Sequence, residues 1–501
     1  MPRNYLPPEI ISHVLSYLDS SSLAPYAIVS KQWQAIIEKR TFSSLSLDTT
    51  QLLELARTVS RPRQHLIRQL RLKILSPEYA PAAREEVETD EDREQNNHAF
   101  TDAIHSLFKV LAGWSNNTEA SLSLSIYARS PSDYVENSLE EIKRRSRNSK
   151  DLLQWRYESS YLQFLDSPET FPMVHTVGAF ETCGNEDIQI NRNIAPAAIS
   201  RILSRLPRVR KVQGRLSDDE RKNHFLRDKL RADFALSLSH WPTSIEHLDL
   251  NYRGWPPMDP NFPPLVRSDP GNDALSIALH CLSQQLVTLS LSDIMISPEL
   301  FWPPGSTTES PPSWPKLMSY RLEYTMATPS GDWLFERDPR WVDSDWSREI
   351  DLELRLPEPK LPAPQDRLDD SWRTKPVQGL MTEFYRAAST AARFMPRLER
   401  MVLHAQLDPG ARNDPEGVIL DAGHWFMYDR ARGYATWAGS GEFHLTEDIR
   451  EAWRSIGTQH GNPVLRIQNE GYLECVSPLE YRRDEGKEDW KEDHGYSVWD
   501  D

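Results

Sequence analysis

The chain has 501 residues, of which 39% are hydrophobic and 26% are charged. This composition is typical of a soluble globular protein, and the length allows about two to four domains. Aspartate and glutamate number 74 against 58 lysine and arginine residues, which gives a formal net charge of -16. A surface that acidic repels phosphate backbones, so we expect no general nucleic-acid partner.

The three cysteines, Cys183, Cys281 and Cys475, are far apart and form no Cys-x-x-Cys pair. This argues against a disulfide framework and a zinc ribbon, and favours a reducing compartment. No apolar run approaches the roughly 18 residues of a membrane span. The N-terminus shows no signal-peptide pattern. We therefore expect a protein of the cytoplasm, the nucleus or both, with no membrane partner.

Residues 6–42 predict three short helices. Pro7 and Pro8 stand where a helix can begin, and Glu9 suits the positive end of its dipole. An apolar stripe at helical spacing follows, made of Ile10, Ile11, Val14, Leu15 and Leu18. A second helix is expected from about Leu23 and a third from Ser30. These helices have more apolar surface than they can bury among themselves, so the pattern predicts a partner.

These residues resemble an F-box: Leu6-Pro7-x-Glu9-Ile10-Ile11, Tyr17-Leu18, Leu23 after a Ser/Asp linker, and Val29-Ser30-Lys31-x-Trp33. Proteins of that family dock onto the Skp adaptor of a cullin-RING (SCF) ubiquitin ligase while the rest of the chain holds a substrate. The resemblance implies that the adaptor contacts Leu6, Pro7, Ile10, Ile11, Val14, Leu15, Leu18, Leu23, Val29 and Trp33. The alternative is a three-helix cap on a larger domain.

Residues 46–410 repeat an amphipathic helix followed by a short Leu-x-Leu strand. Helices are expected at 51–59, 100–111, 199–206, 225–238, 274–282 and 384–395. Strands are expected at 66–72, 122–126, 173–180, 209–212, 245–250, 286–291, 317–324 and 398–403. Such units bury their apolar faces by stacking. The pattern resembles irregular leucine-rich repeats, with strands on the concave side, although Asp293-Ile294 departs from the consensus. A plain alternating α/β sheet is the alternative.

Two polar segments interrupt this array. Residues 80–97 are acidic and predict a disordered or solvated loop. Residues 129–160 are polar, predict a second disordered loop, and contain the basic cluster Lys143-Arg144-Arg145-Ser146-Arg147. As a nuclear-import signal or anion site this cluster is a weak pattern, and a solvated helix or loop is the favoured interpretation.

Residues 411–475 predict a small α+β module. Residues 418–428 are strand-like, 429–433 form a turn, 434–437 pair back, a helix follows Thr446, and 464–467 form a last strand. The segment resembles an uncharacterised C-terminal module that follows an F-box in many fungal proteins, which implies architecture and no chemistry. Residues 476–501 form a charged tail. The predicted fold is thus α/β, with a three-helix F-box at residues 1–45, an irregular leucine-rich-repeat-like solenoid and this module.

No catalytic constellation stands out. The histidines lack the spacing of a helical zinc site, and neither a nucleophile elbow nor a phosphate-binding glycine loop is present. We expect no catalytic residue, metal or cofactor. His247 and Asp249 are interpreted as the solvated face of a strand, and nothing basic flanks Cys183 to activate its thiol.

Four aromatic residues form the remaining candidate for recognition. They lie within a charged, Gly/Pro-punctuated stretch and are Trp333, Phe335, Trp341 and Trp346. Large aromatics are frequent at binding hot spots, so this cluster is a hypothetical substrate site. The alternative is a small core packed over the edge of the repeats.

The sequence as a whole predicts a non-catalytic substrate receptor of an SCF-type ubiquitin ligase. Its partners would be the Skp adaptor, through it the cullin-RING ligase, and a protein substrate held by the repeats. A scaffold or regulator that binds the adaptor without directing ubiquitin transfer remains the alternative, because both need the same docking surface.

Overall fold

The computed structural model of the chain describes residues 6–18, 23–114, 122–133, 156–165, 171–182, 192–218, 223–254, 256–257, 261–337, 373–407, 412–413, 419–420, 423–439 and 443–472. These residues divide into two compact units. The first holds the described residues up to Gly254 together with Ala274–Ile294, and the second holds those of Trp255–Asp273 and from Met295 onward. Both units mix helices and strands, as predicted.

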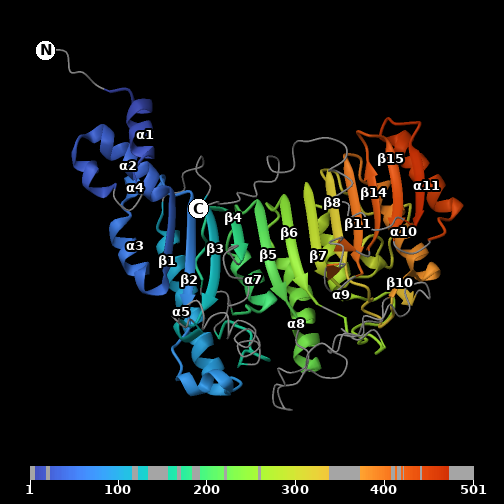
Figure 1. Cartoon of the computed structure of the whole chain (residues 1–501), viewed down its shortest axis with the longest axis horizontal. Helices are drawn as coiled ribbons and strands as arrows, with labels where there is room; N and C mark the ends of the chain where they lie inside the picture. The colour runs from blue at the N-terminus through green and yellow to red at the C-terminus, as the bar shows by residue number, and fades with distance from the viewer. Residues whose placement is uncertain are drawn as a thin grey trace. The chain divides into compact units, whose positions relative to one another are not determined.

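The first unit contains a parallel sheet whose strand order follows the chain (Figure 1). Its strands are β1 (Ser44–Asp48), β2 (Gln69–Leu75), β3 (Leu122–Arg129), β4 (Val177–Thr182), β5 (Lys211–Ser217), β6 (His247–Arg253) and β7 (Thr288–Ile294). Each pairs in parallel with the next. The bounds of β2 to β7 lie within a few residues of the predicted strands. Strand β1 was not predicted, because it continues directly from the helix before it.

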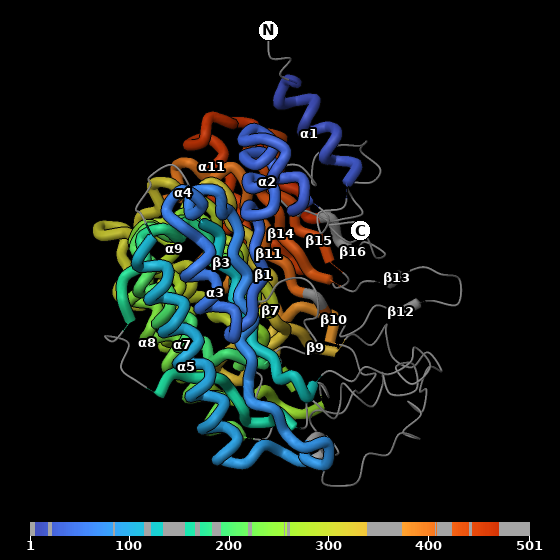
Figure 2. The backbone as a smooth tube through the Cα atoms, turned by 90° about the vertical axis from the view of Figure 1, so that its left-hand side faces the viewer, coloured from blue at the N-terminus to red at the C-terminus, as the bar shows by residue number. Residues whose placement is uncertain are grey.

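Helices cover one face of this sheet (Figure 2). They are α3 (Leu52–Thr58), α4 (Arg61–Gln64), α5 (Asp90–Ala112), α7 (Pro196–Leu203), α8 (His224–Ser237) and α9 (Ala274–Ser283), with short 3-10 turns at Thr49–Gln51, Pro81–Glu85, Pro131–Asp133 and Leu238–His240. Alternate strand residues such as Leu72, Leu124 and Leu250 are buried. Tyr252 of β6 stacks on Phe234 of α8 with ring centroids 5.2 Å apart. The core therefore lies between the strands and the helices, and the remaining strand positions face the other way.

The second unit has a mixed sheet. Its strands, in order, are β8 (Ser319–Tyr324), β11 (Arg400–Gln406), β14 (Gly423–Asp429), β15 (Tyr434–Gly439) and β16 (Arg466–Tyr472). Pairs β8/β11 and β15/β16 are parallel, whereas β11/β14 and β14/β15 are antiparallel. Two strand pairs, β9 (Phe335–Arg337) with β10 (Arg373–Pro376) and β12 (Arg412–Asn413) with β13 (Ile419–Leu420), stand apart from it.

Two helices, α10 (Gln378–Ala392) and α11 (Glu447–Gln459), and a 3-10 turn at Pro298–Leu300 complete the second unit. Its core is aromatic: Phe426 packs on Trp437 and Trp453 with ring centroids 4.4 and 4.7 Å away. The predicted hairpin between β14 and β15 is confirmed, and its turn ends at Gly433 with φ of +68°. Thr446 precedes α11 as predicted, although its hydroxyl makes no capping hydrogen bond.

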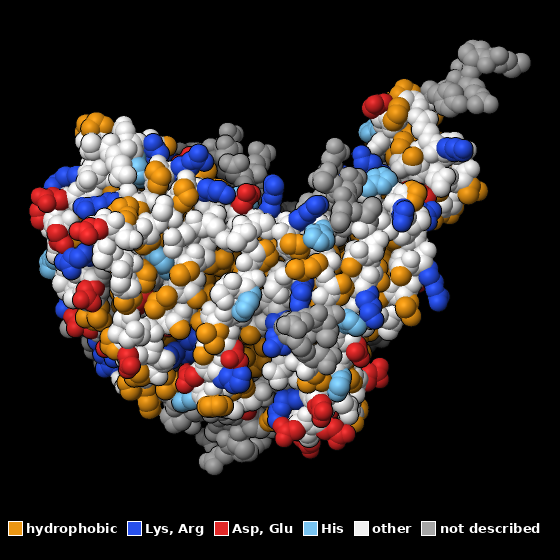
Figure 3. All heavy atoms as spheres, turned by 180° about the vertical axis from the view of Figure 1, so that it is seen from behind, with side chains coloured by type: hydrophobic (Ala, Val, Ile, Leu, Met, Phe, Trp, Pro, Cys, Tyr) orange, Lys and Arg blue, Asp and Glu red, His pale blue; other side chains and the backbone are white. Residues whose placement is uncertain are grey.

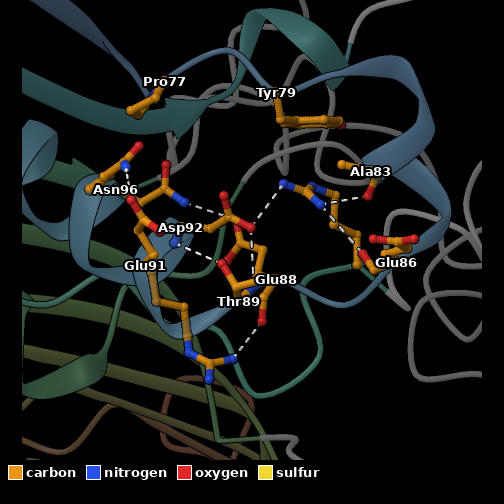
Figure 4. A network of polar contacts seen from close by, with 12 residues as sticks. Pro77, Tyr79, Ala83, Glu86, Glu88, Thr89, Glu91, Asp92 and Asn96 are labelled. Atoms are coloured by element: carbon orange, nitrogen blue, oxygen red, sulfur yellow. Dashed lines mark hydrogen bonds and ion pairs between the residues drawn. The ribbon is translucent and has the colours of Figure 1, made fainter.

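The acidic segment 80–97 is ordered, and the prediction of a disordered or solvated loop was wrong. Helix α5 begins at Asp90, behind a capping box in which the side chains of Thr89 and Asp92 each accept the other's backbone N–H (Figure 4). Acidic residues in the first turn also suit the helix dipole. Glu88 is buried and accepts a hydrogen bond from Asn96 Nδ2 at 2.8 Å.

A buried arginine, Arg156, fixes the loop that precedes α5. Its guanidinium lies 3.7 Å from the centroid of the Tyr79 ring, donates to the Ala83 carbonyl at 2.6 Å, and lies 3.8 Å from the Asp92 carboxylate (Figure 4). The prediction of a disordered loop at 129–160 was wrong for its described ends, 129–133 and 156–160, which are structured and supply this arginine, whereas its basic cluster lies outside the described residues. Charged residues here hold separate segments together, which hydrophobic periodicity does not reveal.

Candidate functional site

The candidate site is the surface of three N-terminal helices. They are α1 (Pro8–Ser16), the 3-10 helix η2 (Ala24–Ile28) and α2 (Lys31–Ser43), close to the predicted positions. Pro7 and Pro8 begin α1, where a missing backbone N–H costs nothing. Ser30 caps α2, and its hydroxyl accepts the N–H of Trp33 at 3.2 Å. Local sequence thus determines where each helix begins.

A small core holds these helices together. Ile11, Leu15, Leu23 and Ile37 are buried, and the part-buried Leu18, Ala27, Trp33 and Ile36 pack against them. Two side chains of α2 also reach back to the first segment: Arg40 donates to the Leu15 carbonyl at 2.7 Å and Gln32 to the Leu6 carbonyl at 3.2 Å. The arrangement of α1 on α2 is therefore set by packing and by hydrogen bonds.

A second set of apolar side chains points outward. Leu6, Ile10 and Val14 are 52%, 47% and 44% exposed, and Tyr17 continues their helical spacing. Tyr26, Ile28 and Val29 on the η2 side are exposed as well. Orange side chains lie on this lobe among polar ones, at the upper right of Figure 3. Several exposed apolar side chains on one small helical lobe favour an interaction surface. We call Leu6, Ile10, Val14, Tyr17, Ile28 and Val29 the apolar face.

The ten residues predicted to contact an adaptor separate into two groups. Leu6, Pro7, Ile10, Val14 and Val29 are exposed, and Leu18 and Trp33 are partly exposed. Ile11, Leu15 and Leu23 are fully buried, so their assignment to the contact surface was wrong. Ile11 and Leu15 belong to the core because α1, packed on one side, turns only part of its apolar stripe outward, and Leu23, just before η2, packs with them. The predicted contact residues do not include the exposed Ile28. A residue in a short 3-10 helix has no helical apolar spacing that could mark it in the sequence.

The helical lobe is attached to the sheet of the first unit. Helix α2 runs directly into β1, and the Ser43 carbonyl accepts the Arg68 N–H at 2.9 Å. Arg63 donates to the Glu38 carboxylate at 2.8 Å, which lowers the pKa of Glu38. The same guanidinium lies over the Phe42 ring at 5.2 Å.

Comparison with family models decides what this lobe is, because the model described as F-box-like matches residues 4–48. The chain carries an F-box-like domain. A second model, described as a family of unknown function (DUF6546), matches residues 371–476. The F-box and the uncharacterised C-terminal module predicted from sequence are thus confirmed. A comparison with curated proteins finds no significant match.

The predicted aromatic substrate site receives no support from the residues that the structure describes. Phe335 is fully buried and packs on His424 with ring centroids 5.7 Å apart, so its assignment to a binding surface was wrong. Trp333 is partly exposed; its indole donates to the Phe262 carbonyl at 3.2 Å, and Arg373 lies over its ring. Trp341 and Trp346 lie outside the described residues. Phe335 therefore belongs to a packed core, in agreement with the alternative interpretation of a small core over the edge of the repeats.

His247 and Asp249 lie on one face of β6. His247 shares a hydrogen bond of 3.0 Å with the Thr288 hydroxyl on the next strand, and Asp249 is partly exposed on the same strand face. Among the described residues, no group of three His, Cys, Asp or Glu side chains could hold a metal ion. Within the same residues, no helix is both long and apolar enough to span a membrane.

Proposed function

We propose that the protein is the substrate-recognition subunit of an SCF-type ubiquitin ligase, binding the Skp adaptor through its F-box-like domain. The apolar face is the observation that carries this proposal. Its side chains are held outward by a packed core, so they can be buried by a partner without unfolding the helices. Burying a half-exposed Leu, Ile or Val side chain contributes about 1 kcal/mol.

The substrate would be held by the remainder of the chain. The strand order of the first unit follows the chain, which is the arrangement expected of stacked helix–strand repeats. Such an array supports the interpretation as an irregular leucine-rich-repeat-like solenoid. A receptor of this kind acts by proximity, raising the concentration of the substrate near the ubiquitin-loaded enzyme, and needs no catalytic residue of its own. Its place would be the cytoplasm or the nucleus.

Co-purification with the Skp adaptor tests this proposal. The full-length chain and a variant lacking residues 1–45 are expressed with an affinity tag, and the eluates are probed for the adaptor and for the cullin. The full-length chain should recover both, and the deletion neither. Equal recovery of the adaptor by both chains would exclude F-box docking. Recovery of the adaptor without the cullin would favour the scaffold without ubiquitin transfer.

A further inference from the structure

Strands β6 and β7 are neighbours in the sheet of the first unit, and they present polar side chains on the face opposite its helices (Figure 1). Side chains alternate along a strand, so the residues between the buried leucines of the two strands point to this second face. All of these polar residues are partly exposed. The register aligns them in three rows, which are His247 with Thr288, Asp249 with Ser290, and Asn251 with Ser292.

The middle row differs from the two outer rows. Each outer row is closed by a side-chain hydrogen bond of 3.0 Å between its two members. Asp249 and Ser290, in contrast, form no side-chain hydrogen bond or ion pair with any residue that the structure describes. Both are partly exposed, so a partner can reach them. The middle row therefore offers such a partner two carboxylate oxygens and a hydroxyl oxygen.

The backbone at Asp293 brings a second carboxylate to these rows. Its φ is +56°, in the left-handed region that residues with a side chain rarely adopt. Ser292 and Asp293 are consecutive, yet both are partly exposed, and Asn251 Nδ2 donates to both side chains, at 3.0 and 2.6 Å. Backbone strain of this kind clusters at functional sites. We call the three rows together with Asp293 the β6–β7 face.

The spacing of the two carboxylates suits an extended peptide. Asp249 stands two residues before Asn251, a rise of about 7 Å along the strand, and Asn251 bonds to Asp293. An extended peptide places alternate side chains at that same spacing. An arginine at one such position would set its planar guanidinium against the oxygens of Asp249 and Ser290. A second arginine two residues further along the peptide would reach Asp293.

The surrounding charge favours a basic partner. The chain has a net charge of -16, which attracts cationic segments over a distance. Lys211 and Arg215 on β5 are diagonal neighbours of Asp249, yet neither forms an ion pair with it. Arg253 ends β6 and forms no ion pair with Asp293. Each carboxylate therefore keeps its charge for a partner, and the two cations of β5 limit the face on that side.

We propose that the β6–β7 face binds an extended basic peptide segment with two arginines at alternate positions, Arg-x-Arg. The inference rests on the proposed function in taking this segment to belong to a substrate protein. Two adjacent arginines carry the same charge but fit less well, because neighbouring side chains of an extended peptide point to opposite sides. The face thus selects a class of substrate by charge and by spacing.

Fluorescence anisotropy of the purified full-length chain tests the inference without the adaptor. The probes are labelled glycine–serine peptides of about nine residues, long enough to cross the face. They carry two alternate arginines, two adjacent arginines, or two alternate glutamines. The Arg-x-Arg probe should bind roughly fivefold or more tightly than the adjacent pair, and more weakly as salt is added. The glutamine probe should not bind. Equal affinity for the two arginine probes, or no binding of either, would overturn the inference.

The double variant Asp249→Asn with Asp293→Asn removes both charges and keeps the side-chain shapes, and asparagine tolerates a positive φ. It should weaken binding of the Arg-x-Arg probe by roughly tenfold or more. A matched double variant, Asp102→Asn with Asp228→Asn, removes two exposed carboxylates of α5 and α8 and should bind as the natural chain does. Equal loss in both double variants, or loss in neither, would also contradict the assignment.

Adaptor co-purification separates this inference from the proposed function. The Asp249→Asn, Asp293→Asn variant should still recover the Skp adaptor through the F-box-like domain. If the natural chain binds the Arg-x-Arg probe and recovers no adaptor, the proposed function fails and the peptide site stands. If it recovers the adaptor and binds no probe, the peptide site alone fails.

Discussion

The carboxylate of Glu88 and the guanidinium of Arg192 lie 2.9 Å apart with both side chains 1% exposed. Glu88 lies just before Thr89, the N-cap of α5, and Arg192 lies shortly before α7. Arg192 also donates to the Ser160 hydroxyl at 2.8 Å, and that hydroxyl donates to Glu88. The pair therefore ties three segments of the first unit together. Both side chains are shielded from solvent, so water cannot hydrate either charge if its partner is removed. Each charge therefore depends on the other.

Removing one member of this pair should destabilise the first unit strongly. Glu88→Gln leaves the Arg192 charge buried without its counter-ion, a change that costs about 3–5 kcal/mol. The measurement is the urea dependence of unfolding. The matched control is Asp233→Asn, which breaks the exposed Lys229–Asp233 pair of α8 and should cost about 1 kcal/mol or less.

The double variant Glu88→Gln with Arg192→Met should be more stable than Glu88→Gln alone, because no unpaired charge is left behind. If Glu88→Gln costs no more than Asp233→Asn, the pair does not hold the segments together.

A buried histidine should make the second unit sensitive to acid. His424 is fully buried beside Tyr385, with its Nδ1 3.1 Å from the tyrosine oxygen, and burial lowers the pKa of His424 to about 3. Burial, and then the charge of Arg321, lower the pKa of His404 to about 4. His404 therefore adds to the acid sensitivity of the second unit. Both imidazoles are therefore neutral in the native state at pH 7.

The unfolded chain binds a proton at an ordinary histidine near pH 6.5, whereas native His424 does not. Stability should thus be constant above about pH 6.5 and fall as the pH drops toward 4, where His424 alone accounts for about 3 kcal/mol. Thermal unfolding measured across this range tests it. His424→Gln should flatten the pH dependence, while Tyr385→Phe lowers stability and keeps the slope. An unchanged slope in His424→Gln would refute the assignment.

Two glycines in helices of the second unit should respond to alanine in opposite directions. A Cβ at Gly457 in α11 would lie 2.7 Å from Leu465 Cβ and 2.9 Å from the Asn462 carbonyl oxygen, whereas one at Gly379 in α10 would meet nothing within 4 Å. Gly457→Ala should cost about 1–3 kcal/mol through overpacking. Gly379→Ala should add up to about 1 kcal/mol through helix propensity. Calorimetric melting temperatures that move in the same direction for both variants would contradict this.

Alanine substitutions at two neighbouring isoleucines of α1 should differ in their effect on stability, because one residue packs in the core and the other lies on the apolar face. Ile11 is buried in the core of the helical lobe and Ile10 is half-exposed on the apolar face. Ile11→Ala should therefore cost about 2–4 kcal/mol of stability, and Ile10→Ala less than about 1 kcal/mol. Protease resistance of the N-terminal lobe reports the difference. Equal cleavage of the two variants would mean that the assignment of Ile11 to the core is wrong.

Much of the fold could be predicted from the sequence because it rests on local signals. Pro7, Pro8 and Ser30 mark helix starts, and the predicted Leu-x-Leu runs Leu70–Leu72, Leu248–Leu250 and Leu289–Leu291 are strand residues with their leucines buried. Segments governed by long-range pairing could not be predicted. Residues 80–97 look solvated by composition, yet Glu88 is buried because Arg192, 104 residues away, provides its counter-ion.

The sequence predicted which segment forms the candidate site, but it did not predict which residues of that segment are buried and which are exposed. Helical spacing shows that Ile10, Ile11, Val14 and Leu15 share one broad stripe, and it does not show which part of that stripe α2 covers. The division into core and exposed face depends on the crossing of two helices, which the stripe alone leaves open. The same limit applies to Phe335, whose burial depends on contacts with β14 and β10.

The affinity of the Skp adaptor for the purified chain tests the central claim most directly. Calorimetric titration should show binding by the natural sequence and a loss of about 1–2 kcal/mol for Ile10→Ser, with an unchanged melting temperature. The control Leu53→Ser alters an exposed leucine of α3, outside the F-box-like match, and should bind normally. No binding by the natural sequence, or an equal loss in Leu53→Ser, would contradict the account.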